Sequence, residues 1–203
     1  MSIVDAERRL LASALLDGAN QRFLLLSESC VPLWNFTFVA NYLLGTRMGF
    51  LHAKPPHKKH TTYQKEMLPE VIEKQWRKGS QWFALTRKLS VEAISDKEIY
   101  AKFATLCKHP CYSDEHYLQT LLSIKRDDEI EHRSITWYDF KKGGKHPASF
   151  KNNDLDVATL EKIKGEPACT WNGVPNQTCH LIARKFLPET LDKLLDLAQG
   201  MGY

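Results

Sequence analysis

The chain has 203 residues, of which 43% are apolar, 10% aromatic and 26% charged, and its formal net charge is +4. These values suit one globular domain, or part of a larger one, and exclude a disordered tail and a collagen-like rod. A dedicated nucleic-acid binder would be more basic, and neither a run of about 18 apolar residues nor a secretory signal is found in this sequence.

The hydrophobic pattern predicts helices that alternate with strands. Helical spacing of apolar residues predicts helices over residues 2–16, 35–44, 87–95, 96–107, 113–124, 155–164 and 188–199. Short apolar runs predict strands over residues 22–26, 80–85, 134–138 and 181–186. We expect Ser113 to cap its helix, with acidic residues in the first turn. The alternation predicts an α/β fold with a mainly parallel sheet.

The cysteines and the glycosylation sequons indicate a compartment. The sequence contains five cysteines, Cys30, Cys107, Cys111, Cys169 and Cys179. None forms a CxxC pair, and their spacings fit no zinc ribbon or finger. The last two bracket a turn-rich stretch that a disulfide could close, and N-glycosylation sequons begin at Asn35 and Asn176. Together these signals favour an oxidising secretory compartment over a cytosolic protein with reduced thiols.

Three ionisable side chains follow one another in the segment CYSDEHY at residues 111–117. Consecutive helical residues point about 100° apart, so these side chains cannot all face one pocket. A carboxylate here could act as a general base toward a hydroxyl. The alternative is a helix cap with a nearby imidazole.

Two other segments suit a sugar and a phosphate. In WRKGSQWF at residues 76–83, Trp82 could stack on a sugar ring and Arg77 could bind its hydroxyls. The alternative is a half-buried strand with aromatic packing. In ARKF at residues 183–186, Arg184 and Lys185 could hold a phosphate at a strand end, or form a solvated basic pair.

Three other patterns give weaker indications of function. The glycines and lysines at residues 141–145 lack the spacing of a P-loop. Asp154 and Asp156 have the DxD form of many metal-dependent sugar transferases, but they open a predicted helix and are interpreted as its cap. The basic loop at residues 52–60 is interpreted as solvated, with proximity to an anionic ligand as the alternative.

Taken together, the motifs resemble a known family. They are, in chain order, VDAERRLL at 4–11, LSESCVPL at 26–33, QWRKGSQWF at 75–83, CYSDEHY at 111–117, GGKHPA at 143–148 and ARKF at 183–186. The sequence resembles the plant branch of the core-2/I-branching β-1,6-N-acetylglucosaminyltransferases, which belong to glycosyltransferase family 14. That family also includes xylosyltransferases and plant glucuronosyltransferases.

The resemblance implies a GT-A-like α/β fold and a type II Golgi membrane protein. It also implies transfer from a UDP-sugar to a glycan or glycoprotein, with inversion and without a metal or other cofactor. By the same resemblance Glu115 is the catalytic base, Lys185 binds the donor diphosphate and Trp137 stacks on the acceptor. Cys169 and Cys179 match a family disulfide.

The sequence also departs from the family pattern. A family basic residue near the second disulfide cysteine corresponds to Asn176, and Arg184 could replace it. A plant Arg-Gly-Arg-Tyr segment reads HTTY at residues 60–63. The family's catalytic region extends further at its N-terminus, so we expect residues 1–203 to be the C-terminal portion of one catalytic domain, without anchor or stem. Cys30 would then pair upstream.

Two functions therefore follow from the resemblance. The first is an inverting, metal-independent transferase that uses glucuronic acid, N-acetylglucosamine or xylose, with plant similarity favouring glucuronic acid on arabinogalactan. The second is a truncated, non-catalytic paralogue that binds glycan or pairs with a full-length partner. No nucleic acid is expected as a partner, and membrane attachment would come only through the missing anchor.

Overall fold

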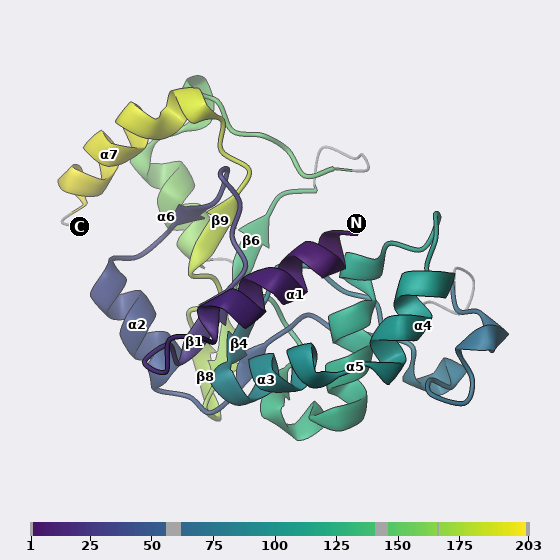
Figure 1. Cartoon of the computed structure of the whole chain (residues 1–203). Coiled ribbons are helices and arrows are strands. Elements are labelled where there is room, and N and C mark those ends of the chain that lie inside the picture. Colours follow the sequence, from purple (N-terminus) through teal and green to yellow (C-terminus); the bar gives the residue numbers. More distant parts are fainter. Residues whose placement is uncertain (1, 56–61, 141–145, 166, 202–203) are drawn as a thin grey trace. The chain divides into compact units, whose positions relative to one another are not determined.

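The computed structural model of the chain describes residues 2–55, 62–140, 146–165 and 167–201 (Figure 1). The polypeptide forms two compact units, one from residues 1–25 and 47–134 and the other from residues 26–46 and 135–203. Each unit contains its own sheet, so each is described by itself.

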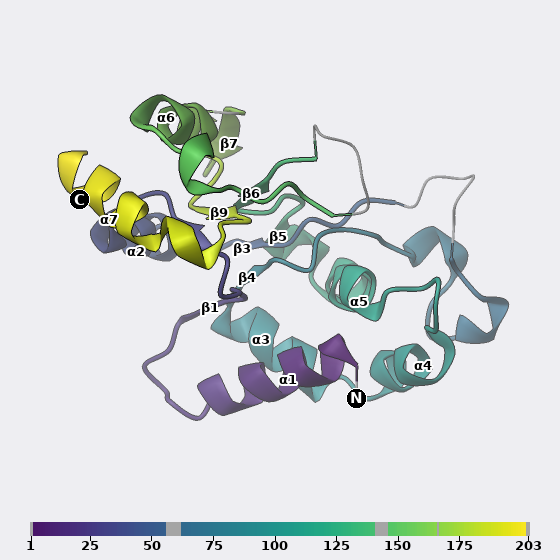
Figure 2. The same cartoon turned by 90° about the horizontal axis from the view of Figure 1, so that it is seen from above.

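The first unit consists of a four-stranded sheet and a group of helices. Its helices are α1 (Ile3–Ala14), α3 (Arg87–Ser95), α4 (Glu98–Leu106) and α5 (Tyr117–Lys125). Its strands are β1 (Arg22–Leu24), β3 (Gly49–Phe50), β4 (Ala84–Thr86) and β5 (Ile130–Glu131), in the order β1-β4-β3-β5. Short 3-10 turns lie at η1 (Lys65–Met67), η2 (Glu73–Gln75), η3 (Ser113–Glu115) and η4 (Asp127–Glu129). Figure 2 shows α1 and α3 together on one side of these strands.

Local side chains define where these helices begin. Ser2 and Asp5 form a capping box at the start of α1, in which each side chain accepts a hydrogen bond from the other residue's backbone N–H. The hydroxyl of Thr86 accepts a hydrogen bond from the N–H of Leu89 and caps α3. Asp96 accepts hydrogen bonds from the first N–H groups of α4 in the same way. These caps explain why the helices predicted at residues 2–16, 87–95 and 96–107 are confirmed with small changes of boundary.

The core of the first unit is rich in aromatic side chains. Trp76, Phe103 and Tyr117 are almost completely buried. The rings of Trp76 and Phe103 stack with centroids 5.0 Å apart. Tyr117 meets Phe103 edge to face at 5.6 Å and places the first turn of α5 against the same cluster. The segment before β4 is thereby fixed against α4 and α5.

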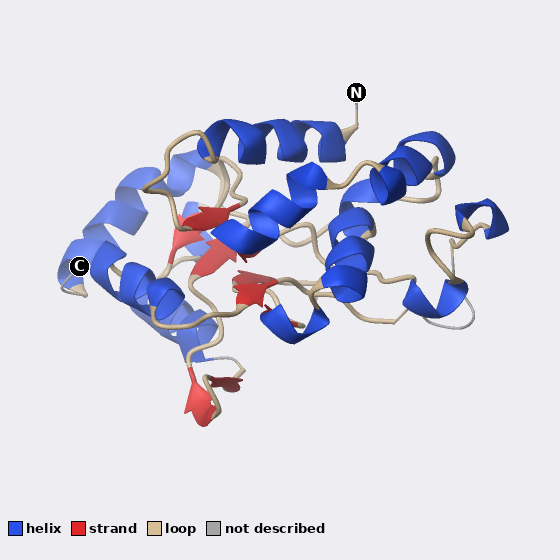
Figure 3. Cartoon of the chain, turned by 60° about the horizontal axis from the view of Figure 1, so that its bottom comes forward, coloured by secondary structure: helices blue, strands red, loops and turns tan. Residues whose placement is uncertain are grey.

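The second unit has a three-stranded sheet and a hairpin. Its strands are β2 (Val31–Pro32), β6 (Thr136–Tyr138) and β9 (Ile182–Arg184), in the order β2-β9-β6, with the hairpin β7 (Cys169–Trp171) and β8 (Val174–Gln177). Its helices are α2 (Phe36–Leu44), α6 (Val157–Gly165) and α7 (Leu191–Gly200), and its 3-10 turns are η5 (Asn152–Asp154) and η6 (Pro188–Thr190). Leu33, Leu155, Ile163, Ala183 and Phe186 form its core. Figure 3 shows how small the strands are beside the helices.

The predicted α/β class is confirmed, since both sheets are mixed and flanked by helices. Parallel pairing is less frequent than predicted. The pairs β3–β5 and β6–β9 are parallel, whereas β1–β4, β3–β4, β2–β9 and β7–β8 are antiparallel. Alternation of helices and strands implies βαβ crossovers, but the chain leaves the first unit after β1 and returns by a loop before β3.

Candidate functional site

The acidic segment of the first unit is a 3-10 turn and not the start of a helix. The turn η3 follows the disulfide between Cys107 and Cys111 and leads into α5. Ser113 was predicted to cap a helix, and this is wrong: among the described residues, no side-chain hydrogen bond caps η3 or α5 at its N-terminus. Instead the carbonyl of Ser113 accepts a hydrogen bond from the N–H of His116 at 3.2 Å. The extra turn separates Glu115 from the regular helix.

Residues 77–80, which precede β4, form hydrogen bonds with η3 and with the first turn of α5. The N–H of Gly79 donates to the carbonyl of Glu115 at 2.9 Å, and the N–H of Arg77 donates to the hydroxyl of Thr120 at 3.0 Å. The amide of the fully buried Gln119 donates to the carbonyls of Ser80 at 2.8 Å and of Asp114 at 3.2 Å. Two segments that the sequence offered as separate candidates therefore form one structure.

Gly79 is required at this position for steric reasons. A Cβ atom there would lie 1.4 Å from the carbonyl oxygen of His52, which is backbone and cannot turn away. Lys54 and Lys78 exchange two backbone hydrogen bonds of 2.9 Å beside it. The close approach allows the chain near His52 to pair with the segment that binds the turn.

Glu115 presents a carboxylate that solvent can reach. Its side chain is 39% exposed, and its Oε2 lies 3.2 Å from the ammonium of Lys78, which is 55% exposed. Exposed ion pairs of this kind contribute at most about 1 kcal/mol, so an incoming hydroxyl could displace the lysine at little cost. The carboxylate is therefore both held by its backbone and available to a ligand.

The side chain of His116 has a structural role. Its side chain is buried, stacks on Trp76 at 4.8 Å and hydrogen-bonds through Nδ1 to the carbonyl of Arg77 at 2.7 Å. Its Nε2 lies 3.2 Å from the hydroxyl of Thr62. Burial lowers the pKa of His116, which favours the neutral ring with Nδ1–H donating to the carbonyl. The imidazole therefore joins the two segments and leaves the carboxylate of Glu115 as the accessible group of the turn.

The other sugar-binding candidates of this unit are engaged locally. Trp82 is 8% exposed, and its carbonyl accepts a hydrogen bond from Ser134, so its burial favours aromatic packing over sugar stacking. The guanidinium of the half-buried Arg77 donates to the carbonyls of Lys74 at 2.7 Å and of Trp76 at 3.1 Å. Arg77 thus braces its own segment beside the turn.

The second unit brings together candidates at the ends of two parallel strands. Trp137 pairs with Ala183 and Tyr138 with Arg184, so β6 and β9 finish at the same edge of the sheet. Lys185 follows directly, and its carbonyl accepts a hydrogen bond from the N–H of Phe150 at 2.8 Å. The half-buried ring of Trp137 lies 5.9 Å from that of Phe150. Trp137, Arg184 and Lys185 thus belong to the carboxyl ends of two neighbouring parallel strands, the edge where ligands bind in open α/β sheets.

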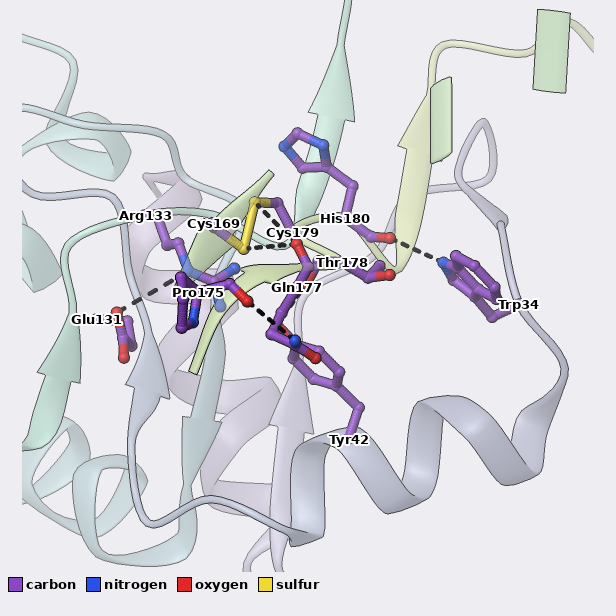
Figure 4. The surroundings of a disulfide bond; sticks show 10 residues. All are labelled: Trp34, Tyr42, Glu131, Arg133, Cys169, Pro175, Gln177, Thr178, Cys179 and His180. Atoms are coloured by element: carbon purple, nitrogen blue, oxygen red, sulfur yellow. Dashed lines mark hydrogen bonds and ion pairs between the residues drawn. A yellow bond between two sulfur atoms is a disulfide. The ribbon is translucent and has the colours of Figure 1, made fainter. Parts of the chain in front are cut away.

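The disulfide between Cys169 and Cys179 is present, as the resemblance implied, and closes the β7–β8 hairpin. Figure 4 shows its surroundings, where Tyr42 donates to the carbonyl of Thr178 at 2.7 Å and Trp34 donates to the carbonyl of His180 at 3.0 Å. These bonds attach the segment between the hairpin and β9 to α2 and to the residue before its N-cap. The sequence also contained a signal for this hairpin, since Asn172 and Gly173 both have positive φ, as a tight hairpin turn requires.

The two sequons differ in their backbone setting. Asn35 is exposed, and its Oδ1 accepts a hydrogen bond from the N–H of Phe38 at the start of α2. Asn176 is an exposed residue of β8 with a φ of 57°. Cys30 carries a free thiol beside the hydroxyl of Ser27, with an Oγ–Sγ distance of 3.4 Å. Cys107–Cys111, a second disulfide, was not predicted.

Of the two DxD aspartates, Asp156 caps α6 as predicted, whereas Asp154 belongs to the separate turn η5 and closes that turn. Asp154 accepts a hydrogen bond from the N–H of Lys151 at 2.8 Å, and Asp156 accepts one from the N–H of Thr159 at 2.7 Å. In the described part of the chain, no group of three or more His, Cys, Asp or Glu side chains could hold a metal ion. The basic loop at 52–60 and the lysines and glycines at 141–145 lie partly or wholly outside the described residues.

The candidates divide between the units. Glu115, Arg77 and Trp82 belong to the first unit, and Lys185, Arg184 and Trp137 belong to the second. Among the helices described, none has the length and apolar character needed to span a membrane.

Comparison with known proteins shows which family the sequence matches. The family model of the Core-2/I-Branching enzyme matches residues 1–164. Glycosyltransferase BC10 of Oryza sativa subsp. japonica is 34% identical over an alignment of 239 residues, which covers 97% of this chain and 59% of the relative. The chain thus spans somewhat more than half the length of this curated relative.

Proposed function

Because the chain belongs to the core-2/I-branching enzyme family, we propose that it carries the catalytic base and part of the donor site of an inverting glycosyltransferase. One observation carries the proposal. Glu115 holds an accessible carboxylate on a turn that is fixed by backbone and buried side-chain hydrogen bonds. A general base needs both properties, since it must reach the substrate and be held in place.

The proposed reaction is a single displacement. Glu115 takes the proton from an acceptor hydroxyl while that oxygen forms a bond to the anomeric carbon of the donor sugar. The bond between this carbon and the diphosphate oxygen breaks, and UDP leaves with the bonding electrons. One attack from the opposite face inverts the anomeric centre, so no covalent intermediate is needed.

The departing diphosphate requires positive charge, and we assign that role to Lys185 with support from Arg184. Both stand at the end of β9, beside the end of β6. No hydrogen bond or ion pair occupies the Lys185 ammonium among the described residues. Trp137 at the same edge is assigned to acceptor stacking. Arg77 and Trp82 are proposed to support the acceptor side through their segment.

The mechanism is proposed to need no metal or other cofactor, because the DxD carboxylates serve as caps and cations stand at the proposed diphosphate site. The donor is a UDP-sugar that carries glucuronic acid, N-acetylglucosamine or xylose, and the acceptor is a glycan or glycoprotein such as an arabinogalactan. The two disulfides and the sequons at Asn35 and Asn176 support an oxidising compartment, and the Golgi is the proposed location.

Calorimetric titration of UDP into the purified chain, without metal, tests the donor site. Saturable binding that Lys185→Ala weakens supports the proposal, and a screen of the three donors follows. A folded chain that binds glycan but no UDP would instead favour the non-catalytic paralogue. Strict dependence of transfer on Mn²⁺ would refute the metal-free mechanism.

A further inference from the structure

A carboxylic acid lies in the apolar face of α1. The buried residues of this helix are Val4, Glu7 and Leu11, which follow one another at helical spacing. Glu7 is 3% exposed, and its Oε1 makes no hydrogen bond to any described residue. An ionised carboxylate in this position would be strongly unfavourable, so the fold selects the uncharged acid.

The neighbouring cation does not neutralise Glu7. The side chain of Arg8 is directed to the C-terminal end of α3. Its guanidinium donates there to the carbonyls of Ile94 at 3.0 Å and of Asp96 at 2.9 Å. It also lies over the ring of Tyr100 at 4.1 Å. Within the described residues, the charged group whose field acts on Glu7 is Asp114 of η3.

Glu7, Asp114 and Glu115 therefore form a series of interacting carboxyl groups. Burial first and the charge of Asp114 second raise the pKa of Glu7 to about 8. Burial also raises the pKa of Asp114, and the charge of Glu115 adds to that increase. Because α1 packs against η3, a charge that appears on Glu7 acts directly on the turn that holds Glu115.

We propose that Glu7 is a positioning residue for this turn: its uncharged carboxyl allows η3 to pack against α1, and its ionisation repels Asp114 and displaces Glu115. The inference rests on the proposed role of Glu115 as the base. It adds that transfer is lost at alkaline pH because the turn that holds Glu115 moves. The residue that ionises, Glu7, contacts neither substrate.

The first test does not use activity. We compare thermal unfolding of the whole chain with that of Glu7→Gln, which keeps the shape of the neutral acid and cannot ionise. A folded-state pKa above the unfolded value of 4.5 means that the stability contribution of Glu7 is complete below pH 4.5 and is lost as pH rises toward about 8. The variant should therefore melt above the wild type by about 3 °C or more at pH 8, with a smaller difference at pH 5.

Exchange at a single amide then reports the position of the turn. The Gly79 N–H is protected by its bond to the Glu115 carbonyl. At pH 9 it should exchange faster in the wild type than in Glu7→Gln, and at pH 6 the two proteins should match. The exposed Glu98→Gln is the control and should behave as the wild type at both values.

The pH profile of transfer separates the two hypotheses. In the wild type, kcat should fall about tenfold per pH unit above pH 8, and Glu7→Gln should remove this decrease. If no variant transfers sugar, the proposed function fails, but unfolding and exchange still decide whether Glu7 holds the turn. If Glu7→Gln does not fold, Asp114→Asn replaces it: without the charge of Asp114 the folded-state pKa of Glu7 should lie lower, so this variant should lose less stability than the wild type between pH 5 and pH 8. Equal pH dependence of wild type and variant in unfolding and exchange would overturn the inference.

Discussion

The backbone N–H of Gly79 and the carbonyl oxygen of Glu115 are joined by a hydrogen bond of 2.9 Å. This bond connects a basic, tryptophan-rich segment to an acidic turn that follows it by more than thirty positions in the chain. The proposed base is therefore held from its main chain, while its side chain stays accessible to a substrate. Several expectations follow from this arrangement.

Replacing Glu115 with glutamine should remove transfer and preserve the fold. The amide keeps the size of the side chain and its partners are exposed, but it cannot accept a proton. Loss of general-base catalysis should reduce kcat by about 100-fold or more. Donor transfer assays measure the loss, and calorimetry should show unchanged UDP affinity. Glu98→Gln is the matched control, and full activity of Glu115→Gln would remove Glu115 from the mechanism.

Replacing Lys185 with alanine should weaken UDP binding. A charge-assisted contact to phosphate contributes roughly 1.5–3 kcal/mol, so the Kd should rise about 10- to 100-fold. The effect should decrease with added salt, since charges interact less at high ionic strength. Lys162→Ala, an exposed lysine of α6, serves as the control. Equal Kd values for both variants would exclude Lys185 from the diphosphate site.

Replacing Gly79 with alanine should destabilise the first unit. The added Cβ would occupy the position of the His52 carbonyl, so the backbone must separate there and the bond to Glu115 is lost. We expect a loss of about 4 kcal/mol or more in the free energy of unfolding. Chemical denaturation measures it. Gly18→Ala is the control, because its Cβ would meet no atom within 4 Å.

Acidification should destabilise the protein through His116. Burial lowers the pKa of this ring in the folded state, so its stability contribution is complete above the unfolded value of 6.5 and is lost as pH falls below it. His116→Gln should reduce the loss of melting temperature between pH 7 and pH 5. The exposed His109→Gln should keep the wild-type slope. A slope that neither variant changes would assign acid sensitivity to other groups.

Thiol titration should separate the oxidised protein from a cytosolic one. The structure pairs Cys107 with Cys111 and Cys169 with Cys179, which leaves Cys30 free. The unfolded, unreduced protein should therefore give one thiol, and the reduced protein five. Five thiols before reduction would support the reading of a protein with reduced cysteines. Cys169→Ser should lower stability by about 3 kcal/mol, as expected for a loop of this length.

The helices could be predicted because their signals are local. Apolar spacing predicted helices at residues 87–95 and 35–44, and the caps that Thr86 and Asn35 form there are contacts within a few residues of the chain. The strands β2, β3 and β5 could not be predicted, because two residues show no periodicity. Their partners are also distant in sequence, so the direction of pairing had no local signal.

The candidate site was predictable in its residue types and not in its arrangement. The acidic segment at residues 111–117 and the basic strand end at residues 183–186 could be recognised from the sequence. The contact of residues 77–80 with η3 depends on Gly79 passing close to His52, which only tertiary structure can reveal. Glu7 was missed because an acidic residue in an amphipathic helix is normally placed on its solvent face.

The pairing of Val31 with Ala183 has a consequence for synthesis. At a translation rate of roughly 5–20 residues per second, β2 leaves the ribosome about eight to thirty seconds before the strand that completes its sheet. During that interval α2, with Phe36 and Leu44 on its surface, and β2 have no sheet to join. The first unit has its last strand, β5, much earlier in the chain. We therefore expect nascent chains that stop before β9 to expose the α2 segment to chaperones and proteases, while the helices around Glu115 are already protected.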